Sequence, residues 1–185
     1  KEGDEITVKD AMRGAAIKSF NEATVMLAER ISGSEWEFAK LMNKKAKELG
    51  MKYTNFRNAS GLHEPGQFTT VYDLARLMMS IRKDFPQKCK YFSEKSFVCD
   101  DRKFVTHNFF LRDYEGATGF KTGYTSIAGY NLMATAERDG KSLTAIIAAC
   151  DRSETRNAYM AKIFDEAFEV VKQDDGEAEV RLVVK

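Results

Sequence analysis

The sequence predicts an α+β fold, on three observations. Apolar residues recur at helical spacing through the first half of the chain, up to about residue 85. Beyond residue 90 the pattern changes to alternation, and Asp139-Gly140 supplies a two-residue turn between two apolar runs. A final amphipathic run over residues 155–171 predicts a helix that packs on the sheet. We expect the functional site where the helical half meets the sheet.

Four helices are predicted in the first half, each delimited by a capping residue, a glycine or a proline. Their expected limits are Thr7 to about Ser19, a start after Ser19 with an end at Gly33, Ser34 to Gly50, and Thr70 to just before Pro86. The segment 51–68 shows neither helical spacing nor strand alternation of apolar residues, so it is expected to be irregular.

Strands are predicted in the second half. Short strands are expected over residues 92–98 and 103–107, and a hairpin over residues 129–137 and 142–150. The run from Ala145 to Ala149 is apolar at every position, which predicts a strand covered on both faces. The polar segment after residue 172 is expected to lead into a strand that begins near Glu179.

Composition excludes several classes of protein. The 185 residues include 29 Lys and Arg against 28 Asp and Glu, and a net charge of +1 argues against a broadly basic nucleic-acid binder. No apolar run approaches the roughly 18 residues that span a bilayer. Two histidines and three scattered cysteines, Cys89, Cys99 and Cys150, predict neither a disulfide framework nor a metal site, and no cofactor is implied.

Two short patterns are candidates for chemistry: Ser19-Phe20-Asn21 between two predicted helices, and Lys121-Thr122-Gly123 at the start of a predicted strand. Each has a structural alternative. Ser19 with Glu22 would make a capping box, and Lys121 could be an exposed lysine beside a strand-edge glycine. A phosphate-binding Walker A loop is excluded, because that loop needs glycine directly before its lysine and Phe120 stands there.

Together the two patterns suggest a catalytic cleft. A serine and an asparagine two positions apart on a tight turn can offer a hydroxyl for proton relay and an amide for a substrate carbonyl. A lysine on a strand would supply positive charge, the next threonine a hydroxyl for a carboxylate, and the glycine a bare backbone that a substrate can approach.

The combination resembles that of penicillin-binding proteins and class A β-lactamases, which join Ser-x-x-Lys, Ser-Asp-Asn and Lys-Thr-Gly. The chain up to about Val171 is similar to D-alanyl-D-alanine carboxypeptidases, the low-molecular-mass penicillin-binding proteins. The similarity lies in consecutive stretches: GDEITVKDAMRGAAIKSFNEA, FAKLMNKKAKELGMKYTNFRNASGL, TTVYDLARLM, YFSEKSF and GATGFKTGYTSIAGYNLMATAERDGKSLTAIIAA.

This resemblance implies a β-lactamase/transpeptidase-like fold, with an antiparallel sheet, flanking helices and a helical subdomain. It implies removal of the terminal D-alanine of peptidoglycan stem peptides through an acyl-enzyme, acylation by β-lactams, and a site outside the cytoplasmic membrane. The implied catalytic residues are Ser19 as proton shuttle, Asn21 as substrate orienter and Lys121 as electrostatic anchor; the implied substrate-binding residues are Thr122, Gly123 and Arg156. Without the resemblance, Arg156 would be interpreted as a helix-face arginine.

The chain departs from the family pattern at the nucleophile. Its one Ser-x-x-Lys, Ser80 to Lys83, falls late in the fourth predicted helix and is rejected as the nucleophile. Residues 1–171 are therefore expected to be a catalytic domain without its first strands and its Ser-x-x-Lys helix, completed by an N-terminal fragment that bears this motif. Residues 172–185 are expected to be a linker and the start of a possible C-terminal β domain.

Two other functions stay open. Ala15-Ala16, Phe20 and Glu22 depart from the family pattern, which keeps open a noncatalytic module that binds stem peptides or a partner. A weaker alternative is an unrelated soluble domain in which Ser19 only caps a helix. A β-lactamase is not expected, because no glutamate lies in a pattern that assigns it to deacylation.

Overall fold

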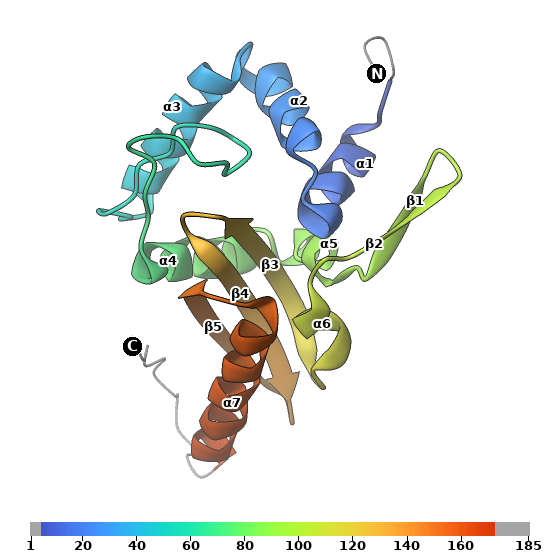
Figure 1. The fold of residues 1–185 in the computed structure, drawn as a ribbon, viewed down its shortest axis with the longest axis vertical. Coiled ribbons are helices and arrows are strands. Elements are labelled where there is room, and N and C mark those ends of the chain that lie inside the picture. The colour runs from blue at the N-terminus through green and yellow to red at the C-terminus, as the bar shows by residue number, and fades with distance from the viewer. Residues whose placement is uncertain (1–4, 173–185) are drawn as a thin grey trace. The chain divides into compact units, whose positions relative to one another are not determined.

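The computed structural model describes residues 5–172, and its chain divides into two compact units. The first unit ends at His107 and the second begins at Asn108. The strand predicted near Glu179 lies outside the described residues. Within them the secondary structure is α+β, as the sequence predicts (Figure 1).

The described part of the first unit is mainly helical. Its helices are α1 (Val8–Arg13), the π-helix η1 (Gly14–Lys18), α2 (Asn21–Ser32), α3 (Glu35–Glu48), α4 (Val71–Asp84), the 3-10 helix η2 (Pro86–Lys88) and α5 (Lys90–Ser93). Three predicted N-caps are confirmed, since each side-chain oxygen accepts a main-chain N–H three residues later at 3.1 to 3.2 Å; these caps are Thr7, Ser34 and Thr70. The four predicted helices are thus present, with the first ending as a π-helix.

A small antiparallel hairpin completes the first unit. Strand β1 (Ser96–Cys99) pairs with β2 (Arg102–Val105). The first predicted strand began too early, because residues 90–93 form α5. The turn between the strands consists of Asp100 and Asp101, which both have positive φ.

The segment between α3 and α4 is irregular, as predicted, apart from one bridge between Asn55 and Phe68. Asp73, buried in the first turn of α4, fastens this segment to the helix. Its carboxylate accepts the N–H of Tyr53 and the hydroxyl of Thr54, both at 2.7 Å. A buried carboxylate with two donors is satisfied, so this contact stabilises the loop.

The described second unit holds an antiparallel sheet of order β3-β4-β5. Its elements are α6 (Phe109–Asp113), β3 (Ala117–Thr125), β4 (Gly129–Arg138), β5 (Lys141–Cys150) and α7 (Ser153–Lys172). The predicted hairpin is confirmed: Arg138 pairs with Lys141 across Asp139 (φ 51°) and Gly140 (φ 72°). These positive φ values are what a two-residue turn of this kind requires.

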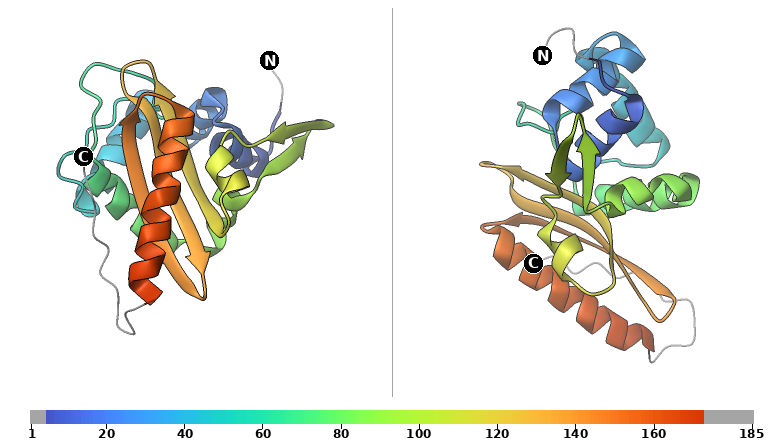
Figure 2. Two further views of the ribbon diagram at one scale, coloured as in Figure 1. Left: turned by 60° about the horizontal axis from the view of Figure 1, so that its bottom comes forward. Right: turned by 90° about the vertical axis from the view of Figure 1, so that its right-hand side faces the viewer.

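Helix α7 covers one face of the sheet and packs on β4 and β5 (Figure 2). Every second residue of these strands faces it, as strand alternation requires. The core so formed consists of Phe110, Leu132, Ala134, Ala136, Ala145, Met160, Phe164 and Phe168. Small residues on β4 let the aromatic rings of the helices approach the sheet closely, which fills the core at high density.

The prediction that residues 145–149 are covered on both faces is only half right. Ala145 and Ile146 are buried, whereas Ala148 and Ala149 are exposed. Pairing with β4 is irregular there, because the register shifts between Tyr130 and Leu132. A bulge of this kind turns side chains away from the regular alternation.

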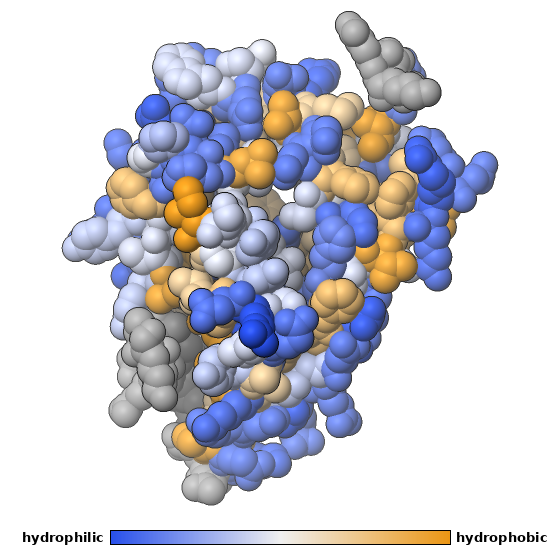
Figure 3. Space-filling model, in the orientation of Figure 1, coloured by the Kyte–Doolittle hydropathy of each residue, from blue (hydrophilic) through white to orange (hydrophobic). Residues whose placement is uncertain are grey.

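The surface is mixed in character. On the face shown in Figure 3, apolar side chains form small groups among hydrophilic ones. Exposed large apolar residues include Ile31, Trp36 and Ile127. In residues 5–172, no helix is both long and apolar enough to cross a membrane.

Candidate functional site

Ser19 has an unusual backbone conformation. It ends η1 with φ 59° and ψ 38°, in the left-handed region, and its N–H donates to the carbonyl of Gly14. The N–H of Phe20 donates to the same carbonyl at 3.0 Å. Helix ends of this type normally carry glycine, and another residue there costs about 1 kcal/mol. Strain of this kind is concentrated at functional sites.

The structural alternative for Ser19, a capping box with Glu22, is contradicted, because Ser19 is not at the N-cap position of α2. Phe20 occupies the N-cap position of α2 and makes no side-chain capping bond. Asn21 is the first residue of α2, and its carbonyl accepts the Thr24 hydroxyl at 2.7 Å. Helix capping therefore does not explain the serine, which is exposed on the turn next to a half-buried asparagine.

Phe20 anchors this turn by its ring. The ring meets Phe104 edge to face, with centroids 5.3 Å apart, and Phe104 stacks on Phe97. A Cβ at position 14 would lie only 3.1 Å from the Phe20 ring, so Gly14 leaves the room that the ring occupies. The residue that departs from the family motif thus packs against the β1–β2 hairpin, while Ser19 and Asn21 flank it.

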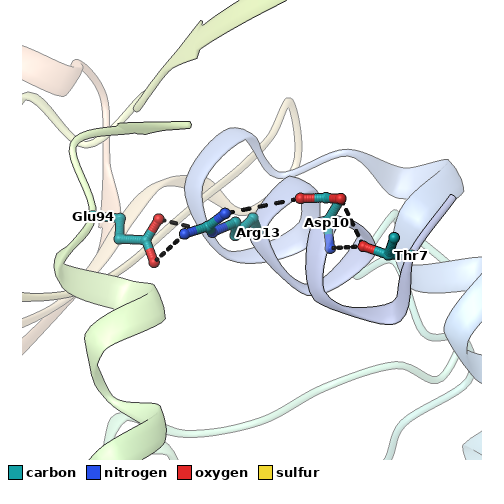
Figure 4. Close-up of polar contacts among 4 residues, drawn as sticks. All are labelled: Thr7, Asp10, Arg13 and Glu94. Carbon is teal, nitrogen blue, oxygen red and sulfur yellow. Dashed lines mark hydrogen bonds and ion pairs between the residues drawn. The ribbon is translucent and has the colours of Figure 1, made fainter. Parts of the chain in front are cut away.

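An ion pair, which sequence patterns did not indicate, holds α1 in place (Figure 4). Arg13 Nε lies 3.0 Å from Glu94 Oε2, and Nη2 donates to Oε1 at 3.4 Å. Asp10 lies on the other side of the guanidinium, at 3.9 Å, and accepts the Thr7 hydroxyl at 2.6 Å. The pair joins α1 to the segment between α5 and β1, so it supports the helix that leads to Ser19.

The Lys-Thr-Gly pattern lies within β3 rather than at its start. Lys121 pairs with Met133, and the next residue, Thr122, pairs with Leu132. Because Leu132 faces α7, alternation puts Thr122 on the covered face and Lys121 on the opposite one. Gly123 is exposed, and among the described strands β3 is at the edge of its sheet.

Lys121 is not the exposed lysine of the structural alternative. Its side chain is half-buried, and Nζ donates to the carbonyl of Thr122 at 2.7 Å. Burial lowers the pKa of Lys121 to about 8 from the usual 10.5, because the ammonium is costly to desolvate. The group is therefore mostly protonated at neutral pH and titrates just above it.

Arg156 is not a surface arginine of the helix face. It lies in the first turn of α7 and is only 3% exposed. Its Nη1 donates to the carbonyl of Asn131 at 3.2 Å, while Nε and Nη2 donate to Asn157 Oδ1 at 3.1 and 2.8 Å. Burial lowers the pKa of this arginine. The guanidinium thereby joins α7 to β4.

The rejection of Ser80 as nucleophile is supported by its contacts. The hydroxyl of Ser80 donates to Asp84 Oδ2 at 2.9 Å near the end of α4, and Lys83 is exposed. An activated serine needs its proton acceptor within hydrogen-bond reach, and a carboxylate at the helix end leaves Lys83 outside that role.

The described residues offer no ready metal centre. Within residues 5–172, no three His, Cys, Asp or Glu side chains lie together as a possible metal site. Cys89, Cys99 and Cys150 are free thiols. The candidate chemistry thus consists of Ser19 and Asn21 on one turn of the first unit, and Lys121, Thr122 and Gly123 on one strand of the second, with Arg156 tied to the neighbouring strand.

An α+β fold with Ser-x-Asn on a turn between helices and Lys-Thr-Gly on an edge strand defines the class of penicillin-binding serine enzymes. Comparison with known proteins identifies the family. The Peptidase S11 family, described as D-alanyl-D-alanine carboxypeptidase, matches residues 1–151. The chain belongs to this family of low-molecular-mass penicillin-binding proteins.

Individual relatives agree with this assignment. D-alanyl-D-alanine carboxypeptidase DacF of Bacillus subtilis (strain 168) is 42% identical over 171 residues, which are 90% of this chain and 44% of that protein. Penicillin binding protein 5 from Haemophilus influenzae superposes with a TM-score of 0.86 at 35% identity, over 90% of this chain and 49% of that one. Penicillin-Binding Protein D2 from Listeria monocytogenes, in its cefotaxime-bound form, superposes with a TM-score of 0.83 at 31% identity. The match covers 91% of this chain and 69% of that one. The chain spans about half the length of the curated relatives it matches.

Proposed function

We propose that this chain works in a serine-type D,D-carboxypeptidase, which removes the terminal D-alanine of peptidoglycan stem peptides through an acyl-enzyme. Family membership supports the activity. The observation that carries it on this chain is the left-handed Ser19, a strained residue that helix capping does not explain. We take the cell envelope outside the cytoplasmic membrane, where peptidoglycan lies, as its place of action.

The candidate residues take distinct roles in the proposed reaction. The nucleophilic hydroxyl attacks the carbonyl of the penultimate D-alanine, and the amide C–N bond then breaks. The Ser19 hydroxyl passes the proton to the leaving nitrogen, so that D-alanine departs as an amine. The Asn21 amide orients the substrate, and water later hydrolyses the ester. Lys121 supplies the positive charge that holds the anionic substrate.

The carboxylate end of the substrate is the proposed ligand of three further residues. Exposed Gly123 leaves the main chain of the β3 edge open to an extended peptide, and Thr122 offers its hydroxyl. Arg156 would add a second positive charge near β4. β-Lactams present a similar carboxylate and a strained amide, and are proposed to acylate the same nucleophile; the related Listeria protein is known in a cefotaxime-bound form.

The nucleophile is proposed to come from an N-terminal segment that bears Ser-x-x-Lys and complements this chain. Two facts support this: Ser80 is engaged with Asp84, and the chain spans 44% of its Bacillus relative. Residues 1–171 are then part of one catalytic domain, and residues 172–185 lead into a further β domain. The chemistry calls for no cofactor. We call the chain together with the nucleophile segment the complete enzyme.

Covalent labelling by a fluorescent penicillin tests the proposal. The complete enzyme should be labelled, whereas this chain alone should not, because the serine of its Ser-x-x-Lys pattern, Ser80, donates to Asp84. A denaturing gel with intact-mass measurement identifies which polypeptide carries the label. Labelling of a preparation that contains only a 21.0 kDa species would contradict the proposal that a complementary segment supplies the nucleophile. Binding of stem peptide by an unlabelled complete enzyme would instead establish a noncatalytic module.

A further inference from the structure

Asn131 lies at the centre of a polar cluster within the second unit. Its Nδ2 donates to the carbonyl of Gly129 at 2.9 Å and to that of Gly123 at 3.4 Å. Its Oδ1 accepts the main-chain N–H of Ala149 at 3.0 Å. Its own carbonyl accepts Arg156 Nη1 at 3.2 Å. One residue therefore contacts all three strands of the described sheet and the helix that covers it.

The backbone around Asn131 explains why an amide is needed there. The β4–β5 register shifts between Tyr130 and Leu132, directly at Asn131, and Ala149 opposite has a positive φ of 62°. An interrupted ladder leaves main-chain groups that must find other partners. A side-chain amide both donates and accepts, so it can replace the missing ladder bonds on either side of the bulge.

Two of the groups that Asn131 holds are candidate substrate-binding residues. Gly123 ends the Lys-Thr-Gly pattern on β3 and pairs with Asn131 across the sheet. Arg156 is tied to the same residue through its guanidinium. A shift of Asn131 would therefore move the exposed strand edge and the buried positive charge together, although Asn131 need not touch the substrate.

We propose that Asn131 is a positioning residue, which sets Gly123 and Arg156 in place for the carboxylate end of the substrate. This inference rests on the proposed D,D-carboxypeptidase function. Loss of the Asn131 side-chain bonds should weaken substrate binding while the bond-breaking groups, Ser19 and the nucleophile, are left intact. The effect should then fall on KM rather than on kcat.

The test compares Asn131→Asp with a matched control, Asn43→Asp, in the complete enzyme. Asn43 also bridges main chain, since it donates to the carbonyl of Phe56 and accepts its N–H, both at 2.7 Å, and Phe56 is not a candidate site residue. Both variants lose the amide donor and should lower the unfolding midpoint. With a peptide ending in D-Ala-D-Ala, Asn131→Asp should raise KM about tenfold, because the bonds from Nδ2 to Gly129 and Gly123 are lost and Gly123 is no longer held in place, with kcat nearly unchanged. Asn43→Asp should leave both constants as they are.

Repeating the comparison in a stabilised variant separates an effect on stability from an effect on substrate positioning. Ala149→Gly relieves the left-handed strain at that residue and should offset the stability that Asn131→Asp loses, so the comparison can be repeated in it for both asparagines. Equal KM values for wild type and Asn131→Asp, or equal losses in both asparagine variants, would overturn the positioning role while the proposed activity stands. A wild-type complete enzyme that neither reacts with penicillin nor cleaves the peptide would overturn the proposed function, and the inference with it.

Discussion

The two candidate elements are held in place in different ways. The Ser19-Phe20-Asn21 turn is irregular and keeps a left-handed serine, whereas Lys121-Thr122-Gly123 lies in a regular strand with paired neighbours. The turn is destabilised by the backbone strain at Ser19, and the strand is destabilised by the desolvation of Lys121. Each element gives up stability at one residue, and in both cases that residue is the one that carries the proposed chemistry.

The largest expected effect is on the strand. Lys121→Ala should reduce acylation of the complete enzyme by penicillin by about a hundredfold or more, as removal of a preorganised electrostatic group does. Lys103→Ala is the control, because Lys103 is an exposed strand lysine of β2. Stopped-flow or gel-based acylation kinetics measure the difference. Unchanged acylation in Lys121→Ala would contradict the proposed role of Lys121 as the electrostatic anchor.

The turn should show a trade between stability and activity. Ser19→Gly removes the strain and should raise the free energy of unfolding by about 1 kcal/mol, while acylation falls about a hundredfold with loss of the proton shuttle. Ser19→Ala should lose the same activity without the gain, since alanine keeps the strain. Asp139→Gly, at another left-handed position, should gain stability and leave acylation alone. Denaturant unfolding measures the change in stability, and acylation rates measure the change in activity. Full activity in Ser19→Gly would contradict the role of Ser19 as proton shuttle.

The pH dependence of acylation tests the role of Lys121 on β3. The pKa of Lys121 is lowered to about 8, so its charge is lost as the pH rises through that value, and acylation should fall about tenfold per pH unit above it. The unfolded chain holds this proton up to the usual pKa of 10.5, so the free energy of unfolding should rise with pH between about 8 and 10.5, as the cost of burying the charged lysine is removed. Lys121→Arg should remove the alkaline limb, because arginine stays charged. A limb that persists in Lys121→Arg belongs to another group.

The smallest expected effect is on the support of the turn. Glu94→Gln removes the charge that pairs with Arg13, at a partly buried position, and should lower the free energy of unfolding by about 1 kcal/mol. Lys45, whose pair with Glu48 is exposed, offers the control Glu48→Gln, with little or no change expected. Equal losses in the two variants would show that the Arg13 pair gives the turn no particular support.

The prediction of elements from sequence succeeded where the causes are local. Thr7, Ser34 and Thr70 cap helices through bonds that span three residues, and Asp139-Gly140 turns the chain within two. The capping box, which was the structural alternative for Ser19, took no account of the π-helix before it or of the packing of Phe20 on Phe104. A contact between residues so far apart in sequence has no local pattern that could reveal it.

By itself, the sequence determined the α+β class, the helix caps, the hairpin turn and the motifs that identify the family. Those features depend on interactions within a few residues or on residue identity alone. Only the tertiary structure decided the left-handed Ser19, the lowered pKa of Lys121, the buried Arg156 and the cluster around Asn131. Burial and strain are sums over contacts from distant segments, so they exist only once the chain has folded.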